Sequence, residues 1–166
     1  MVVRFSKGKR LESIINKTNE YYLSVGLGTV KKVPDSMKVL RHYEKNKSYR
    51  ICIPVDEGLV DYVGCIQGKM MAFDAKETKG KSFPIENLSD RQIKVFKEFQ
   101  ASGCECFLII NFTESDNFYK VPFLELNEYI EKTGKKSIPE KQLLLNSYEI
   151  KIVKINEYLH ILDYFC

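Results

Sequence analysis

Residues 60–78, VDYVGCIQGKMMAFDAKET, carry the clearest structural signal in the chain: two short strands joined by a turn at Gln67-Gly68. If these two residues form the turn, residue 66 pairs with residue 69. Counting back along both strands places Asp61 opposite Asp74, and residue 59 opposite Lys76. Side chains directly opposite each other on one face of a hairpin have Cβ atoms roughly 4.5–5.5 Å apart. We therefore predict that Asp61, Asp74 and Lys76 share one face of a hairpin.

These three charged side chains suit a site for metal-dependent phosphodiester cleavage. Two carboxylates that face each other repel unless a cation lies between them. Magnesium is commonly held by one or two carboxylates together with waters, and a bound metal activates water for hydrolysis. Lys76, two residues beyond Asp74, adds a positive charge on the same face. The alternative from spacing alone is a surface ion pair between exposed strand charges.

The composition is that of an ordinary globular protein. The 166 residues are 44% hydrophobic and 29% charged, and we expect one domain over residues 1–166. No apolar run approaches the ~18–20 residues that span a bilayer, and the first residues lack the apolar core of a signal peptide. The five cysteines are odd in number and favour reduced thiols. The sequence thus predicts a cytoplasmic protein without a membrane partner.

Upstream of the hairpin, residues 10–23 have the spacing of an amphipathic helix. Three polar residues share a face next to its apolar one: Glu12, Asn16 and Asn19. An acid followed by two amides can reach into a site beside the core. The alternative is a solvated helix face.

Residues 31–50 form the most basic block of the chain, directly upstream of the paired acids. Its seven cations are Lys31, Lys32, Lys38, Arg41, Lys45, Lys47 and Arg50. Only two acids, Asp35 and Glu44, oppose them, and aromatic residues lie between them. A basic, aromatic-containing segment beside a metal site suits a phosphate-rich polymer substrate. A solvated surface segment is the alternative.

Downstream of the hairpin, Ser89-Asp90-Arg91-Gln92 has the spacing of a capping box, so Gln92 is first explained as part of a helix cap. The unbroken apolar run CFLIINF is typical of a strand buried on both faces. The remaining pattern predicts a helix over residues 90–100, a strand over 118–121, a helix over 124–132, a short helix after Pro139 and a final hairpin. Together these elements predict an α/β fold with a mixed central β-sheet flanked by helices.

With these residues in hand, the chain resembles the RecU-type Holliday junction resolvases, a branch of the PD-(D/E)xK nuclease superfamily. The resemblance extends over nearly the whole length. It rests on LESIINKTNEYY, VDYVG…GKMMAFDAKET, SFPIENLSDRQ, GCECFLIINF and KSIP. The combination of FDAKET with FP…N…Q is specific, whereas an isolated D…DxK occurs by chance in many lysine-rich chains. The resemblance implies a restriction-endonuclease-like core with a projecting basic stalk at about residues 31–54.

The resemblance also implies roles for single residues. Asp61 and Asp74 would be the carboxylates that bind Mg²⁺, for which Mn²⁺ would substitute, and Lys76 would be the catalytic lysine. Gln92 matches the glutamine that the family assigns to the metal site, and Glu12 matches the first-helix acid that completes many sites of the superfamily. The seven cations of residues 31–50 would bind DNA.

The implied partner is branched DNA in the form of a four-way junction, in recombination and repair. Two symmetric cuts by a domain with one site are made most economically by a C2 homodimer, and recombination proteins are further candidate partners. The sequence departs from the family at Leu59, where a threonine of the metal site is usual. Two alternatives remain open: another PD-(D/E)xK nuclease that cuts duplex DNA, and a non-catalytic accessory protein that binds branched DNA.

Overall fold

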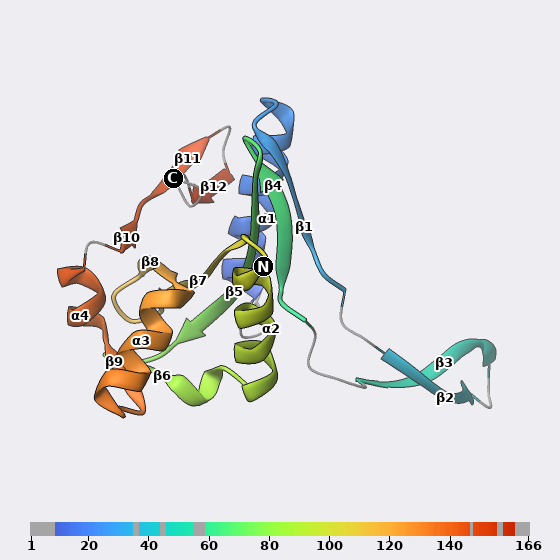
Figure 1. Cartoon of the computed structure of the whole chain (residues 1–166). Coiled ribbons are helices and arrows are strands. Elements are labelled where there is room, and N and C mark those ends of the chain that lie inside the picture. Colours follow the sequence, from blue (N-terminus) through green and yellow to red (C-terminus); the bar gives the residue numbers. More distant parts are fainter. Residues whose placement is uncertain are drawn as a thin grey trace.

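A six-stranded mixed sheet lies at the centre of the computed structural model, which describes residues 9–34, 37–43, 46–54, 59–146, 148–155 and 158–161. The strand order is β1-β4-β5-β7-β8-β10 (Figure 1). The strands are β1 (Gly28–Lys32), β4 (Tyr62–Ile66), β5 (Lys69–Thr78), β7 (Glu105–Phe112), β8 (Asn117–Pro122) and β10 (Glu149–Ile150). Only β5 and β7 run parallel; the other neighbours in this sheet are antiparallel. The predicted mixed sheet is confirmed.

The β4–β5 hairpin has the predicted register. Ile66 pairs with Lys69 across the turn, and Tyr62 pairs with Phe73. Gln67 and Gly68 both have positive φ, 50° and 80°, as a two-residue turn of the primed type requires. One step beyond the last pair, Asp61 and Asp74 lie opposite each other.

The helix α1 (Lys9–Ser24) covers one face of the sheet, where its apolar residues pack with the strands. Three aromatic rings stack across neighbouring strands beneath it, with centroids 4.9 Å apart for Tyr62 and Phe73 and 4.8 Å for Phe73 and Phe107. Because side chains alternate along β5, Phe73 faces α1 while Asp74 and Lys76 point to the opposite face.

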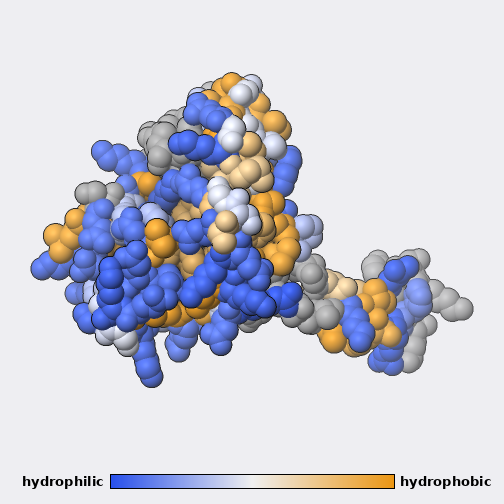
Figure 2. Space-filling view, viewed as in Figure 1, coloured by the Kyte–Doolittle hydropathy of each residue, from blue (hydrophilic) through white to orange (hydrophobic). Residues whose placement is uncertain are grey.

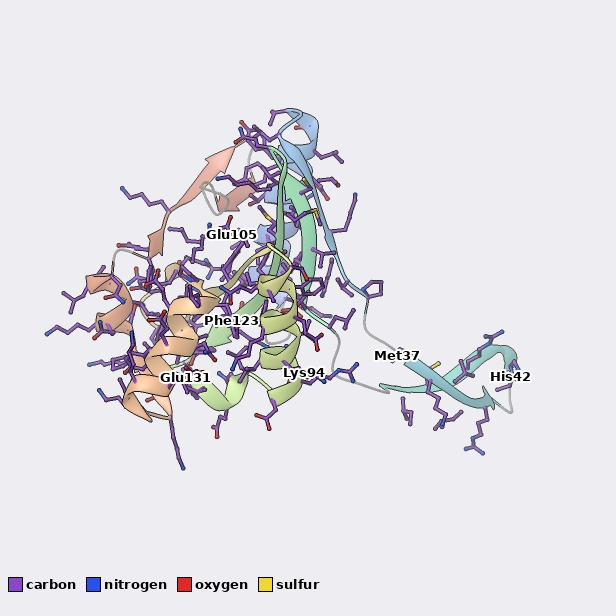
Figure 3. All side chains as sticks on the ribbon, in the orientation of Figure 1. Met37, His42, Lys94, Glu105, Phe123 and Glu131 are labelled. Carbon is purple, nitrogen blue, oxygen red and sulfur yellow. The ribbon has the colours of Figure 1, made fainter. Side chains whose placement is uncertain are left out.

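The opposite face carries α2 (Asp90–Ala101), α3 (Phe123–Thr133) and α4 (Glu140–Leu145). Phe123 lies where α3 begins, beside α2 (Figure 3), and its ring stacks on Phe96 at 4.9 Å. The strand β7 runs between the two layers, and every residue from Cys106 to Phe112 is buried. This confirms the prediction of a strand covered on both faces.

A two-stranded ribbon projects from the body of the molecule (Figure 1). Its strands are β2 (Met37–Tyr43) and β3 (Asn46–Pro54), and we call residues 37–54 the stalk. Met37 lies at its base and His42 near its far end (Figure 3). The stalk exposes apolar as well as charged side chains (Figure 2), the apolar ones being Met37, Val39, Leu40 and Ile53. Lys45 lies outside the described residues, and the side chain of Lys47 is not described.

Three local features go beyond the sequence prediction. Gly28 lies in β1, where a Cβ atom would be 2.2 Å from the carbonyl oxygen of Cys65. In the final segment, β11 (Ile152–Ile155) pairs with β12 (Tyr158–Ile161), while β10 joins β8 in the central sheet. Finally, β6 (Ser82–Pro84) pairs with β9 (Ser137–Pro139), a contact between short segments that no local pattern predicts.

Two smaller points complete the fold. A 3-10 helix, η1 (Ile85–Asn87), connects β6 to the start of α2. None of the described helices is long and apolar enough to cross a membrane.

The close approach of β1 and β4 makes a stability prediction. A Cβ atom on Gly64 would lie 2.4 Å from the carbonyl oxygen of Thr29, so Gly64→Ala must push the edge strand away. We expect the free energy of unfolding to fall by about 1–3 kcal/mol, measured by urea denaturation. Met70→Ala, at an exposed position on β5, is the control and should change it by less than about 0.5 kcal/mol. Equal stability of the two variants would contradict the prediction.

Candidate active site

Asp61 and Asp74 are locked together through the backbone of the hairpin. The Asp61 N–H donates a hydrogen bond of 2.8 Å to Asp74 Oδ1. In return, Asp61 Oδ2 accepts a 2.9 Å bond from the N–H of Ala75. Asp74 is fully buried, whereas Asp61 is only partly covered. The predicted pairing of the two acids on one face is therefore present in the fold.

Burial of this pair perturbs its electrostatics. Loss of hydration, and next the neighbouring charge of Asp74, raise the pKa of Asp61 from 3.8 to about 6. The Ala75 N–H and the Lys76 ammonium oppose that rise without cancelling it. The two carboxylates thus carry more negative charge than their protein surroundings compensate. A divalent cation bound between them would relieve this repulsion.

Lys76 and Gln92 complete the cluster around Asp74. Lys76 Nζ lies 3.3 Å from Asp74 Oδ2 and donates a 3.3 Å hydrogen bond to Gln92 Oε1. The side-chain amide of Gln92 donates to Asp74 Oδ2. Lys76 keeps 18% of its side chain exposed, enough to reach a substrate in solution. Asp74 is therefore oriented on one side by the backbone and on the other by Lys76 and Gln92.

Gln92 is held in place because it also caps α2. The Gln92 N–H donates to Ser89 Oγ at 3.2 Å, and Gln92 Oε1 accepts from the Ser89 N–H at 3.2 Å. This reciprocal pair is the capping box predicted from the sequence. The same side chain thus caps the start of the helix and contacts Asp74, so the two interpretations of Gln92 are compatible. Its oxygen already accepts from Ser89 and Lys76 and would have to exchange one of them to bind a metal.

Glu12 lies at the rim of this cluster rather than inside it. Its carboxylate pairs with Lys32 on β1, with Nζ and Oε2 2.6 Å apart. No direct contact joins it to either aspartate among the described residues, although its charge contributes to the raised pKa of Asp61. One turn further along α1, Asn16 Oδ1 accepts a 3.1 Å hydrogen bond from the hydroxyl of Tyr62. The polar face of α1 is therefore anchored beside the site.

The stalk begins at the site itself. β1 ends at Lys32 and its neighbour β4 starts at Tyr62, and residues 37–54 of the chain between them form the stalk. At this root, the N–H of Val33 donates a 2.8 Å bond to the backbone oxygen of Asp61. Of the predicted DNA-binding cations, Lys31 is exposed on the edge strand, and the exposed side chains on the stalk are Lys38, Arg41 and Arg50.

The ligand chemistry of the cluster fits a hard divalent cation. Across the described parts of the chain, no three His, Cys, Asp or Glu side chains gather closely enough to hold a metal ion. The two opposed carboxylates match magnesium, which is usually bound by one or two carboxylates and retains waters. Leu59, two residues before Asp61, is 49% exposed, and its side chain has no oxygen to offer a metal.

Comparison with known proteins places the chain in a family. The family model described as recombination protein U matches residues 6–165. The chain belongs to this family. A Holliday junction resolvase RecU from Bacillus subtilis is 34% identical over 157 residues, covering 89% of this chain and 74% of the relative. One from Lactococcus lactis is 33% identical over 173 residues, covering 100% of this chain and 81% of the relative.

A solved structure resembles the fold of this family member. It is Hjc of Archaeoglobus fulgidus, described as a Holliday junction resolvase from an archaeal hyperthermophile. The TM-score is 0.50 at 16% sequence identity, with 83% of this chain and 93% of that chain covered. The likeness confirms the predicted restriction-endonuclease-like core. The family resemblance inferred from the sequence motifs is confirmed by the family match.

Sequence reasoning missed two contacts around the site of this RecU family member. Lys32 was assigned to DNA alone, yet its ammonium group pairs with Glu12. Tyr62 was assigned no role, although its hydroxyl fastens α1 to the hairpin. An alternating strand pattern that puts Lys32 on the α1 face could have indicated the first contact. The second depends on how α1 lies on the sheet, which periodicity does not specify.

The raised pKa of Asp61 makes a prediction for the metal-free protein. The pKa of Asp61 is about 6 in the folded protein and has the ordinary value of 3.8 in the unfolded chain. As the pH rises, the unfolded chain therefore releases the Asp61 proton before the folded protein does. The contribution of Asp61 to stability is therefore full below about pH 4 and is lost as the pH rises through 6. In EDTA, we expect Asp61→Asn to have a higher Tm than the wild type at pH 7.5 and a smaller decline in Tm between pH 4 and 7.

Added Mg²⁺ supplies the second half of this test. It should raise the Tm of the wild type at pH 7.5 and leave that of Asp61→Asn unchanged. The control is Asp116→Asn, which removes an exposed acid paired with Arg10 and should respond to Mg²⁺ as the wild type does. If the Tm of the wild type and the Tm of Asp61→Asn changed with pH in parallel, the acidic pair would carry no excess negative charge.

Proposed function

We propose that this chain is a metal-dependent endonuclease that resolves four-way DNA junctions in recombination and repair. The observation that carries the proposal is the pair of opposed carboxylates, Asp74 buried and Asp61 partly buried, with Lys76 beside them at the root of a projecting basic stalk. An acidic pair alone fits many metal enzymes. The acidic pair lies where the cation-bearing stalk leaves the body, a position that suits a nucleic-acid substrate. Relatives that match most of the chain are described as Holliday junction resolvases.

In the proposed mechanism, Asp61 and Asp74 hold Mg²⁺, or Mn²⁺ in its place. The bound metal would polarise the scissile phosphate and lower the pKa of a coordinated water. Gln92 and the Asp61 N–H orient the Asp74 carboxylate for this task. Lys76 places a positive charge where negative charge develops on the phosphorane-like transition state. Its low exposure strengthens that interaction, because water screens it less.

In this proposal, Glu12 acts only after a DNA phosphate has displaced it from Lys32. In the chain alone its carboxylate is paired with Lys32 at the rim of the site. A DNA phosphate near β1 would compete for Lys32, because both anions attract the same ammonium group. Glu12 would then be available to orient the attacking water. Lys32 and Glu12 thus act in turn, the first on DNA and the second on water.

The assembly and setting follow from the substrate. A junction has two strands to cut symmetrically, and a chain with one site does so most simply as a C2 homodimer. We propose that residues 1–166 act as one resolvase domain, with the stalk projecting into the junction. We also propose that the protein works in the cytoplasm on nucleoid DNA, alongside recombination proteins.

Cleavage of defined DNA tests the proposal. With Mg²⁺, the wild type should cut a four-way junction and leave a linear duplex of the same sequence intact; with EDTA it should cut neither. Equal rates on both substrates would indicate a duplex-cutting nuclease. Binding without any cleavage would indicate a non-catalytic junction-binding protein.

Two site variants test the assignment of the residues. We expect Asp74→Asn to remove the metal and Lys76→Ala to lower the cleavage rate by about 10²–10³-fold, the usual cost of losing one transition-state contact. Junction binding should remain within a few-fold of the wild type, as measured by gel shift in EDTA. Asp116→Asn, an exposed acid far from the site in sequence, is the matched control. Full activity of Lys76→Ala would remove it from the mechanism.

The stalk makes a separate prediction about binding. Replacing Lys38, Arg41 and Arg50 with Ala should lower the slope of log Kd against log salt by up to about 3, because each lost phosphate contact accounts for about 0.9. The control triple replaces three other lysines with Ser: Lys17 on α1, Lys69 at the β4–β5 turn and Lys151 after β10. An unchanged slope for the stalk variant would show that these cations do not face DNA.

A further inference from the structure

A second cationic surface lies beyond the end of β5, built around the β6–β9 pair. Its lysines come from two segments far apart in the chain: Lys79, Lys81, Lys135, Lys136 and Lys141. All five are exposed, and only Glu86 and Glu140 oppose them within residues 79–87 and 134–142. We call these residues, with β6 and β9, the basic ribbon. It contains none of the cations discussed so far.

Backbone hydrogen bonds hold the two segments side by side. The Ile85 N–H donates to the carbonyl of Lys136, and the Glu140 N–H donates to the carbonyl of Lys81, both at 2.9 Å. Between these bonds, Ser82 pairs with Pro139 and Phe83 with Ile138. Phe83 and Ile138 are both buried in the core on the α2 side. The basic ribbon is therefore a firm edge of the body.

The lysines of the basic ribbon lack the acidic partners that the lysines of α2 and α3 have. On α2 and α3, Lys94 pairs with Glu98, Lys97 with Glu131 and Lys132 with Glu128. None of the five ribbon lysines forms such an ion pair with an acid of the described chain.

The acid inside the ribbon is engaged elsewhere. Glu140 Oε1 accepts hydrogen bonds from Ser115, Asn117 and Tyr119 at 2.6, 2.9 and 3.1 Å. These bonds hold the Glu140 carboxylate on the β7–β8 side of the ribbon. The ribbon lysines are therefore available to bind an external anion.

The position of the basic ribbon relates it to the candidate active site. β5 carries Lys76 and ends at Thr78, so Lys79 lies roughly 10 Å beyond Lys76 along the strand direction. The stalk leaves the body on one side of the start of α2, and β6 and β9 lie on the other (Figure 1). A DNA strand bound at Lys76 and touching the stalk on one side would approach the ribbon on the other.

We propose that the basic ribbon binds the phosphate backbone of the duplex arm that leaves the cleavage site on the side away from the stalk. The proposal rests on the proposed junction nuclease function. Duplex DNA presents about one negative charge per 1.7 Å of its axis, so an arm passing the ribbon offers several phosphates to its lysines. Lysine is a mobile point charge without base selectivity, which suits contact with an arm of any sequence. The stalk and the ribbon would together set the direction of the arm across the site.

The salt dependence of junction binding tests this proposal directly. We expect the ribbon triple, in which Lys79, Lys81 and Lys136 are replaced by Ser, to lower the slope of log Kd against log salt by up to about 3 in EDTA. The control triple at Lys17, Lys69 and Lys151 removes the same charge and should retain the wild-type slope. Equal slopes for the ribbon triple, the control triple and the wild type would overturn the proposal.

Footprinting on a junction locates the contact. The wild type should protect backbone positions on one arm beginning about three nucleotides from the cut, since 10 Å corresponds to about three base-pair rises. The ribbon triple should lose that protection and keep the protection at the junction centre. If the ribbon triple lost protection only at the junction centre, the assignment of the basic ribbon to an arm would be contradicted. These readouts need no cleavage, so a wild type that never cuts DNA would refute the proposed nuclease while leaving the ribbon test valid.

Discussion

The opposition of Asp61 and Asp74 is the constraint on which the site depends. Two carboxylates are brought face to face at the end of a hairpin, and each is held by a backbone N–H of the other strand. Burial strips hydration from the Asp61 carboxyl and, in addition, leaves the charge of Asp74 poorly screened, and these two effects raise the pKa of Asp61 to about 6. A protein keeps such a pair only where the surrounding fold stabilises it. Here the aromatic stack beneath α1 and the buried strand β7 supply that support.

Gln92, in the first turn of α2, both stabilises the helix and contacts the candidate site. Gln92 is needed by the helix because it satisfies the Ser89 N–H, and the same side chain donates to Asp74. A residue with both duties has little freedom to move, so Asp74 and Lys76 are positioned by a helix cap rather than by a flexible loop. The side chains of the candidate site are thereby held in place by the fold itself. On the opposite side, the Glu12–Lys32 pair is partly exposed and joins two elements only at their edge, so it is the part of the site most easily rearranged.

Most of the fold could be predicted from local patterns. The register of the β4–β5 hairpin follows from a two-residue turn and the alternation of its strands, and the capping box marks the start of α2. The run Cys106–Phe112 is apolar apart from Asn111, which is typical of a strand covered on both faces. The β6–β9 pairing could not be predicted in this way. Each partner is three residues long, more than fifty positions separate them, and what joins them is the burial of Phe83 and Ile138 in a shared core.

The contacts of the candidate site are likewise of two kinds: those that local sequence patterns predict and those that depend on tertiary packing. The sequence by itself determined that Asp61, Asp74 and Lys76 share a face, because strand periodicity and one turn relate all three. It also determined that Gln92 belongs to the cap at the start of a helix, and the motifs around these residues determined the family. Only the tertiary structure decided that Gln92 reaches Asp74, that Glu12 is held by Lys32 at the rim, and that lysines from two distant segments form the basic ribbon. Those contacts depend on how helices and short strands pack on the sheet, and packing is set by the whole core rather than by any one segment.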